Sequence, residues 1–518
     1  MDAAGITLLE VITMMPLIAE GSMPAGYTLG TGGLAFIGLY VLSLIGVGWL
    51  GHRAKRAETL DDHYLGGRAL GMGVLFLTLY ATQYSGNSFM GFVGKAYRGG
   101  FPFLYSVIAM MAVVAGYFVF APRLHRLSHR KGYVTLGDYV QDRFGYRPLT
   151  VFIVMLGILG LANYVLTNLL ALGKLTEVVS GGQVGFNVAV VLLAAVMVSY
   201  ETLGGMRSVA WTDVIQGIIL LVSLCFIAFA LFVHLGGPAG VAEGLEAANP
   251  KVWDPPTGMQ KVGWLSSALL FFFGISMYPH AIQRIYAARN ESALRRSLQM
   301  MAFMPLVTTL VLVLLGIMAI AILPGLDAVE IDGEIVDQSD RTILFMVGKL
   351  VDELPAIAVM GPLLVAAVIA ATMSTIDSAL LSISSMVSND LYRPVRPKVS
   401  TAHLTRVGKQ TSVLLMIAVV LLTIALQDQT IWRLLEIKLE ILAQIAPTVM
   451  LGLQWRKLKA RAVFAGAVTG TSVAICLTLG AAAKPLGVHA GIWGLGANLL
   501  MILIVQTLSQ QKQKLPAT

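Results

Sequence analysis

Charged side chains and cysteines are both scarce in this chain of 518 residues, and each shortage excludes a class of protein. Only 12% of the residues are charged, whereas about a quarter are charged in soluble domains. Hydrophobic residues make up 57% of the sequence, and the mean hydropathy is +0.78. The two cysteines, Cys225 and Cys476, lie within apolar segments, so we expect neither a disulfide framework nor a cysteine metal site. The composition therefore predicts a polytopic membrane protein.

The sequence also lacks the signatures of secretion and of catalysis. No basic stretch precedes the short apolar run within residues 1–22, so we expect no cleavable signal peptide. Neither a His-Glu-x-x-His motif nor a nucleophile–base constellation occurs, so we expect no enzymatic activity. The net charge of +8 comes from short basic groups between apolar segments, a pattern that orients membrane proteins and does not indicate nucleic-acid binding.

Thirteen apolar segments of about 17 to 30 residues are each long enough to cross roughly 30 Å of hydrocarbon. They begin near Leu34, Leu70, Phe101, Leu149, Val184, Val209, Val262, Leu298, Leu354, Val407, Ile431, Val463 and Val488. Lys and Arg gather in alternate connections, such as residues 123–131 and 284–296, while residues 327–340 on the opposite side are acidic. By the positive-inside rule, we expect a multi-pass protein of the cell membrane with its N-terminus outside and its C-terminus in the cytoplasm.

Two of these spans contain helix breakers near their middle. The second span has a polar, glycine-containing patch at residues 81–88, and the seventh has Gly274 and Pro279 within residues 273–280. Glycine and proline are common in membrane helices, but unwound backbone at membrane depth is tolerated where it lines a cavity or binds a ligand. The two patches are five spans apart, and this odd offset inverts one half of the chain relative to the other. The pattern favours a transporter built from inverted repeats.

A polar run, residues 370–378, interrupts the ninth span. On a helix, Ser374, Thr375 and Asp377 fall within about half of the circumference. A carboxylate at this depth costs about 3 kcal/mol or more unless a partner offsets the cost, and a bound cation is one such partner. Hydrogen bonds to neighbouring helices or to the i−4 carbonyl are the alternative role for the two hydroxyls.

Oxygen atoms of the second and ninth spans together suit a sodium ion. The predicted ligands are the carbonyls of Ala81, Tyr84 and Ala371 and the hydroxyls of Ser374 and Thr375. The set offers no nitrogen or sulfur, which argues against zinc and copper, and too few carboxylates for a tight divalent site. Asp213 of the sixth span lies at a similar depth to Asp377, so either carboxylate could serve a second sodium or a proton. A hydrogen bond to helix-end amides or to Thr212 is the structural alternative for Asp213.

Three motifs give the chain a family resemblance. They are the glycine pair and Trp-Thr-Asp stretch of residues 204–216, the run 371–378 with the segment 389–393 at its end, and Tyr-Leu-Gly-Gly-Arg at 64–68. From about Leu34 to Gln454 the chain resembles the sodium:solute symporter family. The resemblance implies an all-α protein with a ten-helix core of two inverted five-helix repeats, the leucine-transporter type of fold. The expected divisions are an N-terminal segment, an extra helix with its loop, the two repeats, and two C-terminal helices: residues 1–30, 31–69, 70–235, 236–455 and 456–518.

The resemblance also carries site residues. The family's shared sodium site maps onto the five residues chosen above. An additional sodium site of some members would fall on Asp213, Ser374, Asp377 and Ser378, although an aspartate stands here where some relatives have a hydroxyl residue. The substrate would lie beside the two breaks, against Gln83, Ser85, Gly86, Asn87, Phe272, Phe273, Gly274 and Met277. Gln83 replaces the aspartate of proline-type members, and the apolar seventh span is unlike that of sugar transporters, so we expect a small organic anion or zwitterion.

The sequence thus predicts sodium-coupled uptake of a small organic solute, an organic acid or amino acid, by alternating access. Its partners would be Na+, the solute and the lipid bilayer, with no nucleic acid and no obligate protein partner. Two alternatives stay open: a proton-coupled symporter that uses Asp377 and Asp213, and a membrane sensor that does not transport. Glu436, Lys438 and Glu440 in the eleventh span are expected to form a solvated rim or an ion-paired gate.

Overall fold

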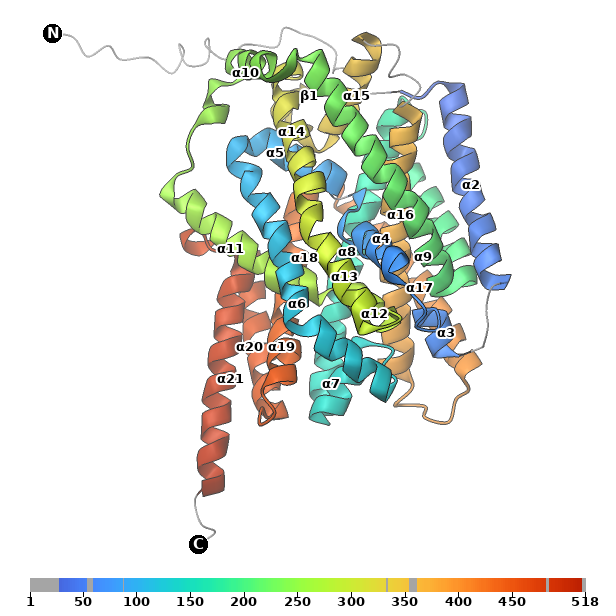
Figure 1. Ribbon diagram of the computed structural model, residues 1–518, viewed down its shortest axis with the longest axis vertical. Helices are drawn as coiled ribbons and strands as arrows, with labels where there is room; N and C mark the ends of the chain where they lie inside the picture. Colours follow the sequence, from blue (N-terminus) through green and yellow to red (C-terminus); the bar gives the residue numbers. More distant parts are fainter. Residues whose placement is uncertain are drawn as a thin grey trace, which may run out of the picture.

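The computed structural model describes residues 28–53, 59–86, 88–331, 334–353, 361–480 and 484–514. Within these ranges the protein is a bundle of helices (Figure 1), with one short antiparallel hairpin of strands β1 (Val329–Ile331) and β2 (Glu334–Val336). Helix α2 lies at one edge of the bundle, and α20 and α21 pack together at another edge (Figure 1). Apart from the hairpin, the predicted all-helical class is confirmed.

The helices follow one another along the chain with short connections. The first half contains α2 (Thr31–Arg53), α3 (Leu60–Leu65), α4 (Met72–Gln83), η1 (Ser88–Phe92), α5 (Val93–Gly99), η2 (Phe101–Leu104), α6 (Tyr105–Lys131), α7 (Leu136–Phe144), α8 (Arg147–Val179), α9 (Phe186–His234), α10 (Gly237–Ala248) and η3 (Pro250–Trp253). The second half contains α11 (Gly258–Gly274), η4 (Ile275–Met277), α12 (Pro279–Ala287), α13 (Glu291–Met304), η5 (Pro305–Thr309), α14 (Leu310–Ile322), η6 (Ser339–Arg341), α15 (Thr342–Glu353), α16 (Gly361–Ser385), η8 (Met386–Tyr392), α17 (Thr401–Ala425), α18 (Ile431–Leu442), η9 (Ala443–Ile445), α19 (Ala446–Gln454), α20 (Ala460–Leu479), η10 (Pro485–Gly487) and α21 (Ala490–Lys514).

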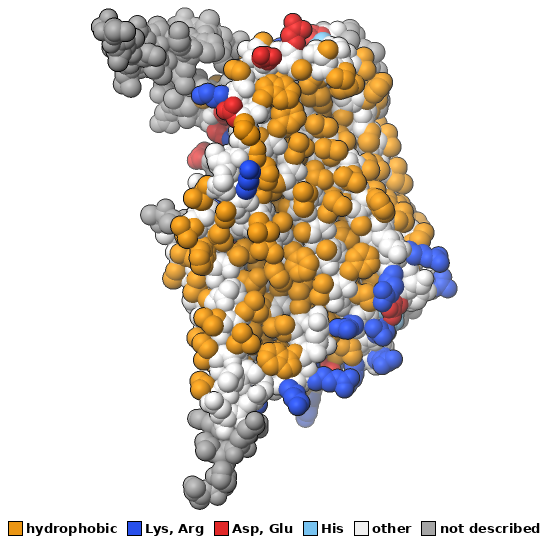
Figure 2. Space-filling model, turned by 60° about the vertical axis from the view of Figure 1, so that its left-hand side comes forward, with side chains coloured by type: hydrophobic (Ala, Val, Ile, Leu, Met, Phe, Trp, Pro, Cys, Tyr) orange, Lys and Arg blue, Asp and Glu red, His pale blue; other side chains and the backbone are white. Residues whose placement is uncertain are grey.

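The described helices give the molecule the surface of a membrane protein. Eight of them are long and apolar enough to cross a membrane, or nine if α11 and α12 form one bent span. Figure 2 shows a broad hydrophobic surface between one end where Lys and Arg gather and an opposite end that carries acidic side chains. The multi-pass class is confirmed, while the count of thirteen spans stays a prediction.

Both predicted helix breaks are present. Helix α4 ends at Gln83, and Tyr84 has extended backbone (φ −111°, ψ 99°) before the chain turns into the π-helix η1. Helix α11 ends at Gly274, and Tyr278 (ψ 117°) separates η4 from α12. Pro279 is the first residue of α12, where its missing N–H leaves no helical hydrogen bond unmade. The two segments flanking Tyr278 meet at an angle of 56°.

The element α9 consists of two helical segments that meet at Gly205, close to Arg207, where two separate spans were expected to join. Gly205 is non-helical, and its φ of +67° with ψ of −167° suits glycine. A Cβ atom on Gly205 would lie 2.8 Å from the carbonyl oxygen of His63. Just beyond the kink, Arg207 forms an ion pair of 2.5 Å with Asp62. Gly205 thus forms the break between the two segments of α9 at the point where α9 packs against α3.

Helix α16 runs through the interior. In its most apolar stretch, 94% of the residues are buried, and it packs against α8 and α9. The polar run of residues 370–378 is therefore enclosed by protein, so its hydroxyls and carboxylate must find their partners on α16 itself or on neighbouring helices.

Candidate functional site

The end of α4 meets the middle of α16 through three oxygen atoms. The Thr375 hydroxyl oxygen lies 2.9 Å from the Ala371 carbonyl oxygen and 3.4 Å from the Ala81 carbonyl oxygen. All three residues are buried. Tyr84, another predicted ligand, stands at the break itself, and its side-chain hydroxyl pairs with Thr309 at 3.2 Å.

Ser374, the fifth predicted ligand, is engaged with a second group of residues. Its hydroxyl donates a hydrogen bond to Oδ1 of Asp213. A hydroxyl that donates its proton still has oxygen lone pairs, so this bond does not prevent Ser374 from contacting a cation. Ser374 therefore connects the α4–α16 contact to Asp213 of α9.

Asp213 is paired with an arginine that sequence reasoning placed elsewhere. Arg284 of α12 was expected in a basic connection outside the membrane, which is wrong, because its exposed fraction is 0%. Its Nη2 lies 2.9 Å from Oδ2 of Asp213 and 2.6 Å from the Ser378 hydroxyl, and its Nε donates to the Thr78 hydroxyl at 2.8 Å. Nη1 donates to the His280 carbonyl at 3.1 Å.

The residues expected to hold a second cation therefore surround a guanidinium group. Asp213 and Ser378 contact Arg284 directly, and Ser374 bonds to the other oxygen of Asp213. Asp377, next to Ser378 on α16, is also buried. The signal in the sequence was Asp213 itself, because a buried carboxylate requires a positive partner. The identity of that positive partner, Arg284, depends on how α9 and α12 pack, which the sequence pattern does not show.

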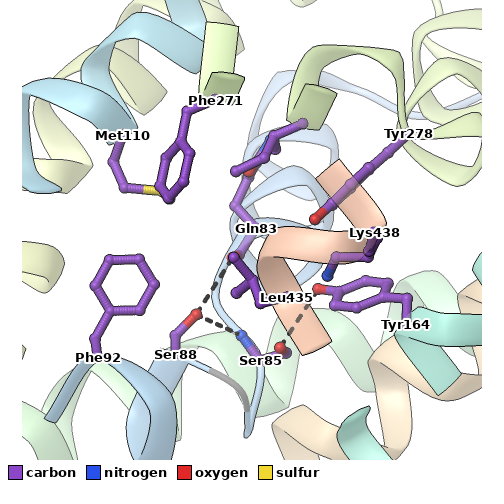
Figure 3. Close-up of a pocket in the computed structure, with 11 residues that line it drawn as sticks. Gln83, Ser85, Ser88, Phe92, Met110, Tyr164, Phe271, Tyr278, Leu435 and Lys438 are labelled. Carbon is purple, nitrogen blue, oxygen red and sulfur yellow. Dashed lines mark hydrogen bonds between the residues drawn. The ribbon is translucent and has the colours of Figure 1, made fainter. Parts of the chain in front are cut away.

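A small cavity lies between the two helix breaks (Figure 3). Its lining comes from α4, η1, α6, α8, α11, η4 and α18: Gln83, Ser85, Ser88, Phe92, Met110, Tyr164, Phe271, Ile275, Tyr278, Leu435 and Lys438. Its volume is about 20 Å³, which suits one water molecule, so a metabolite needs the helices to move apart.

Two of the predicted substrate residues, Gln83 and Ser85, line this cavity. The others that the structure describes are not among its lining residues: Gly86 lies against Thr372, Gly274 against Leu439, Met277 in the core, and Phe272 and Phe273 with ring centroids 4.7 Å apart. Asn87 lies outside the described residues.

Lys438 is the unexpected member of the cavity. It was expected in a solvated rim or an ion-paired gate, but its exposed fraction is 0% and its Nζ has no hydrogen-bond partner in the described part of the chain. Nζ lies 3.6 Å from the ring centroid of Tyr164 and 5.1 Å from that of Tyr278. The Oε1 atom of Gln83 likewise has no partner among the described residues, while its Nε2 donates to Tyr117 at 2.9 Å.

The neighbours of Lys438 on α18 are buried and not a solvated rim. Glu436 pairs with Lys484 at 2.7 Å and accepts a hydrogen bond from the Trp432 ring nitrogen at 2.8 Å. Glu440 accepts a hydrogen bond of 2.5 Å from Thr478. Two acidic residues thus tie α18 to the C-terminal helices, which leaves Lys438 as the charged residue of this helix that faces the cavity.

The motifs at the basic end of the molecule hold helices together. Asp390 accepts a hydrogen bond of 2.6 Å from the Thr135 hydroxyl, and Asn389 donates to Asp138 at 2.9 Å. Arg68 of the Tyr-Leu-Gly-Gly-Arg motif pairs with Asp61 at 2.7 Å. Asn389 and Asp390 thus join η8 to α7, while the Arg68–Asp61 pair ties α3 to the turn that follows it, and none of these residues lines the cavity.

Comparison with known proteins finds similar sequences and a similar fold over most of the chain. The model of the Sodium:solute symporter family matches residues 63–470. The osmoregulated proline transporter OpuE of Bacillus subtilis is 26% identical over 92% of this chain and 95% of its own length. The high-affinity proline transporter PutP of the same organism is 27% identical over 88% of this chain and 94% of its own length. A solved Na+-coupled sialic acid symporter in a substrate-bound outward-open state shares the fold, with a TM-score of 0.74, 20% identity, and coverage of 92% of this chain and 98% of that structure.

Proposed function

Because the chain belongs to the sodium:solute symporter family, and so is a sodium-coupled transporter and not an enzyme, we propose that sodium binds where α4 ends against α16. One observation carries this proposal: two carbonyl oxygens, of Ala81 on α4 and Ala371 on α16, lie within 3.4 Å of the buried Thr375 hydroxyl oxygen. Ser374 and Tyr84 are the remaining proposed ligands. Neutral oxygens suit a hard monovalent cation, and a break in a membrane helix supplies carbonyls that no i+4 amide uses.

The proposed transport cycle is alternating access. Sodium bound between α4 and α16 would stabilise the outward-open state and complete the cavity beside the break. Because coupling is reciprocal, solute would then raise the affinity for sodium by the same factor as sodium raises the affinity for solute. The small volume of the cavity in this conformation fits a cycle in which solute enters only after helices separate.

We also propose the finer architecture that the sequence predicts. It comprises thirteen spans, inverted repeats at residues 70–235 and 236–455, and an N-terminus outside the cell. The equivalent breaks after α4 and after α11 support the repeats, and the basic end of the surface in Figure 2 supports the orientation.

The solute is proposed to be a small organic acid or amino acid. Lys438 supports this choice, because its ammonium group faces the cavity, has no hydrogen-bond partner among the residues that the structure describes, and can pair with a carboxylate. Gln83 and Ser85 would contact the rest of the solute. Proton coupling through Asp213 is disfavoured, since that carboxylate is paired with Arg284.

Uptake into proteoliposomes tests the proposal. Labelled carboxylates and amino acids are offered under an inward sodium gradient and under an equal gradient of choline. We expect labelled solute to accumulate under the sodium gradient and not under the choline gradient. Equal uptake in choline would contradict sodium coupling, and uptake that a protonophore abolishes in the absence of sodium would indicate a proton instead.

A further inference from the structure

Arg284 occupies the place where a second cation was expected. Its guanidinium contacts Asp213 and Ser378, while Ser374 bonds to the opposite oxygen of Asp213. Thr78 of α4 completes the surroundings, so the group joins α4, α9, α12 and α16. Asp213, Ser374 and Ser378 are three of the four residues at which a second sodium ion was expected, and Asp377 is the fourth.

Four hydrogen bonds hold the guanidinium in this site. All three of its nitrogens donate hydrogen bonds, at distances between 2.6 and 3.1 Å, to Thr78, His280, Asp213 and Ser378. Arginine keeps its charge under all physiological conditions, so this positive charge is permanent. A sodium ion bound to the same oxygens would lie directly against a like charge in a buried, weakly screened environment.

A merely structural ion pair would also join helices, but the position of this pair matters for coupling. Ser374 connects Asp213 to Thr375, its neighbour in the proposed sodium site. The charge that balances Asp213 therefore affects the residues that hold sodium. In this chain the balance comes from a side chain that cannot dissociate, whereas a second sodium would have to arrive and leave in every cycle.

We propose that Arg284 is a tethered cation that fills the second cation site, so that this transporter binds one sodium ion per cycle. The inference rests on the proposed sodium site at Ala81, Ala371 and Thr375. It makes Asp213 a permanently paired carboxylate whose role is to position Ser374.

Counting bound sodium tests the inference without knowledge of the solute. Binding of radiolabelled sodium to the purified full-length protein should saturate at about one ion per chain, with no cooperativity. Arg284→Ala leaves Asp213 without its partner, so this variant should bind a second monovalent cation. It should also gain thermal stability from guanidinium ion at low millimolar concentration, because a ligand that binds the folded state stabilises it. The double variant Arg284→Ala/Asp213→Asn removes the negative charge and should lose both effects.

Two further variants control for folding and for general charge loss. Arg284→Lys keeps a tethered positive charge and should bind one sodium ion, while Arg289→Ala removes an exposed arginine nearby and should behave like the parent protein. Two sodium ions in the parent protein would overturn the inference. The inference would also be overturned by an Arg284→Ala variant that folds, binds only one sodium ion and gains no thermal stability from guanidinium ion. No sodium binding to the parent protein would instead overturn the proposed sodium site, and the inference with it.

Discussion

The ammonium group of Lys438 lies 3.6 Å from the ring centroid of Tyr164, a cation–π contact inside the cavity between the two helix breaks. The hydroxyl of the same tyrosine donates to the Thr82 carbonyl at 3.1 Å. Tyr164 thus contacts both the end of α4 and the charged residue of α18. A cation–π contact offsets part of the cost of burying an ammonium group, but it leaves the three N–H donors available. A carboxylate that entered the cavity would find a charge already desolvated and directed at it (Figure 3).

Lys438→Met is expected to lower the affinity for a carboxylate solute about 10- to 100-fold, because a hydrogen bond to a charged group contributes about 1.5–3 kcal/mol. Sodium binding in the absence of solute should change little, since Lys438 lies outside the proposed sodium site. Solute affinity is measured by competition against a labelled solute.

Two controls accompany this measurement. Lys457→Met removes an exposed lysine and should have no effect on solute affinity. Methyl esters of the solute should bind the parent protein weakly. If Lys438→Met bound acid and ester as the parent protein does, Lys438 would not be the carboxylate partner.

Thr375→Val is expected to raise the sodium concentration for half-maximal uptake by about tenfold or more, the equivalent of about 1.4 kcal/mol. The substitution keeps the shape of the side chain and removes the hydroxyl that lies near the carbonyls of Ala81 and Ala371. Thr423→Val is a matched control, because Thr423 is also buried and bonds to its own i−4 carbonyl at 2.8 Å. Sodium titrations of uptake compare the two, and identical curves would count against the site.

The sequence predicted the parts of this site that depend on local chemistry. Helix breakers at Gly274 and Pro279 and the polar run around Thr375 could be found because they depart from the surrounding apolar pattern. The partner of Asp213 could not, since Arg284 is 71 residues away and reaches it only through helix packing. Lys438 was misplaced for a related reason. Which face of α18 points inward depends on its rotation against α8, and a helix with charges on several faces does not reveal it.

Gly205→Ala is expected to destabilise the protein by about 1–3 kcal/mol, because its positive φ with ψ near 180° is a backbone conformation essentially restricted to glycine, with crowding against His63 in addition. Gly217→Ala on the same helix is the control, because its Cβ would meet Tyr80 at an ordinary 3.4 Å. Thermal unfolding in detergent should therefore show a lower Tm for Gly205→Ala than for Gly217→Ala. Equal Tm values would show that the kink of α9 tolerates a side chain.

Gly86→Ala tests whether close approach of the broken helix to α16 is required for sodium binding. A Cβ on Gly86 would collide with the hydroxyl of Thr372, and the Thr372 Cβ and Cγ2 atoms would lie 3.0 Å away. The substitution should separate the break from α16 and weaken sodium binding. Thr372→Ala in the same chain removes the hydroxyl and the methyl group, so the double variant should recover part of the affinity. Gly86→Ala/Thr372→Ser keeps the colliding oxygen and should not recover sodium affinity.

Sodium binding measured across the parent protein, the single variant and both double variants separates a size effect from a loss of polar contacts. Equal recovery with Ala and Ser would show that the hydroxyl is not the obstacle, and an unchanged affinity in Gly86→Ala would show that sodium binding does not depend on this contact.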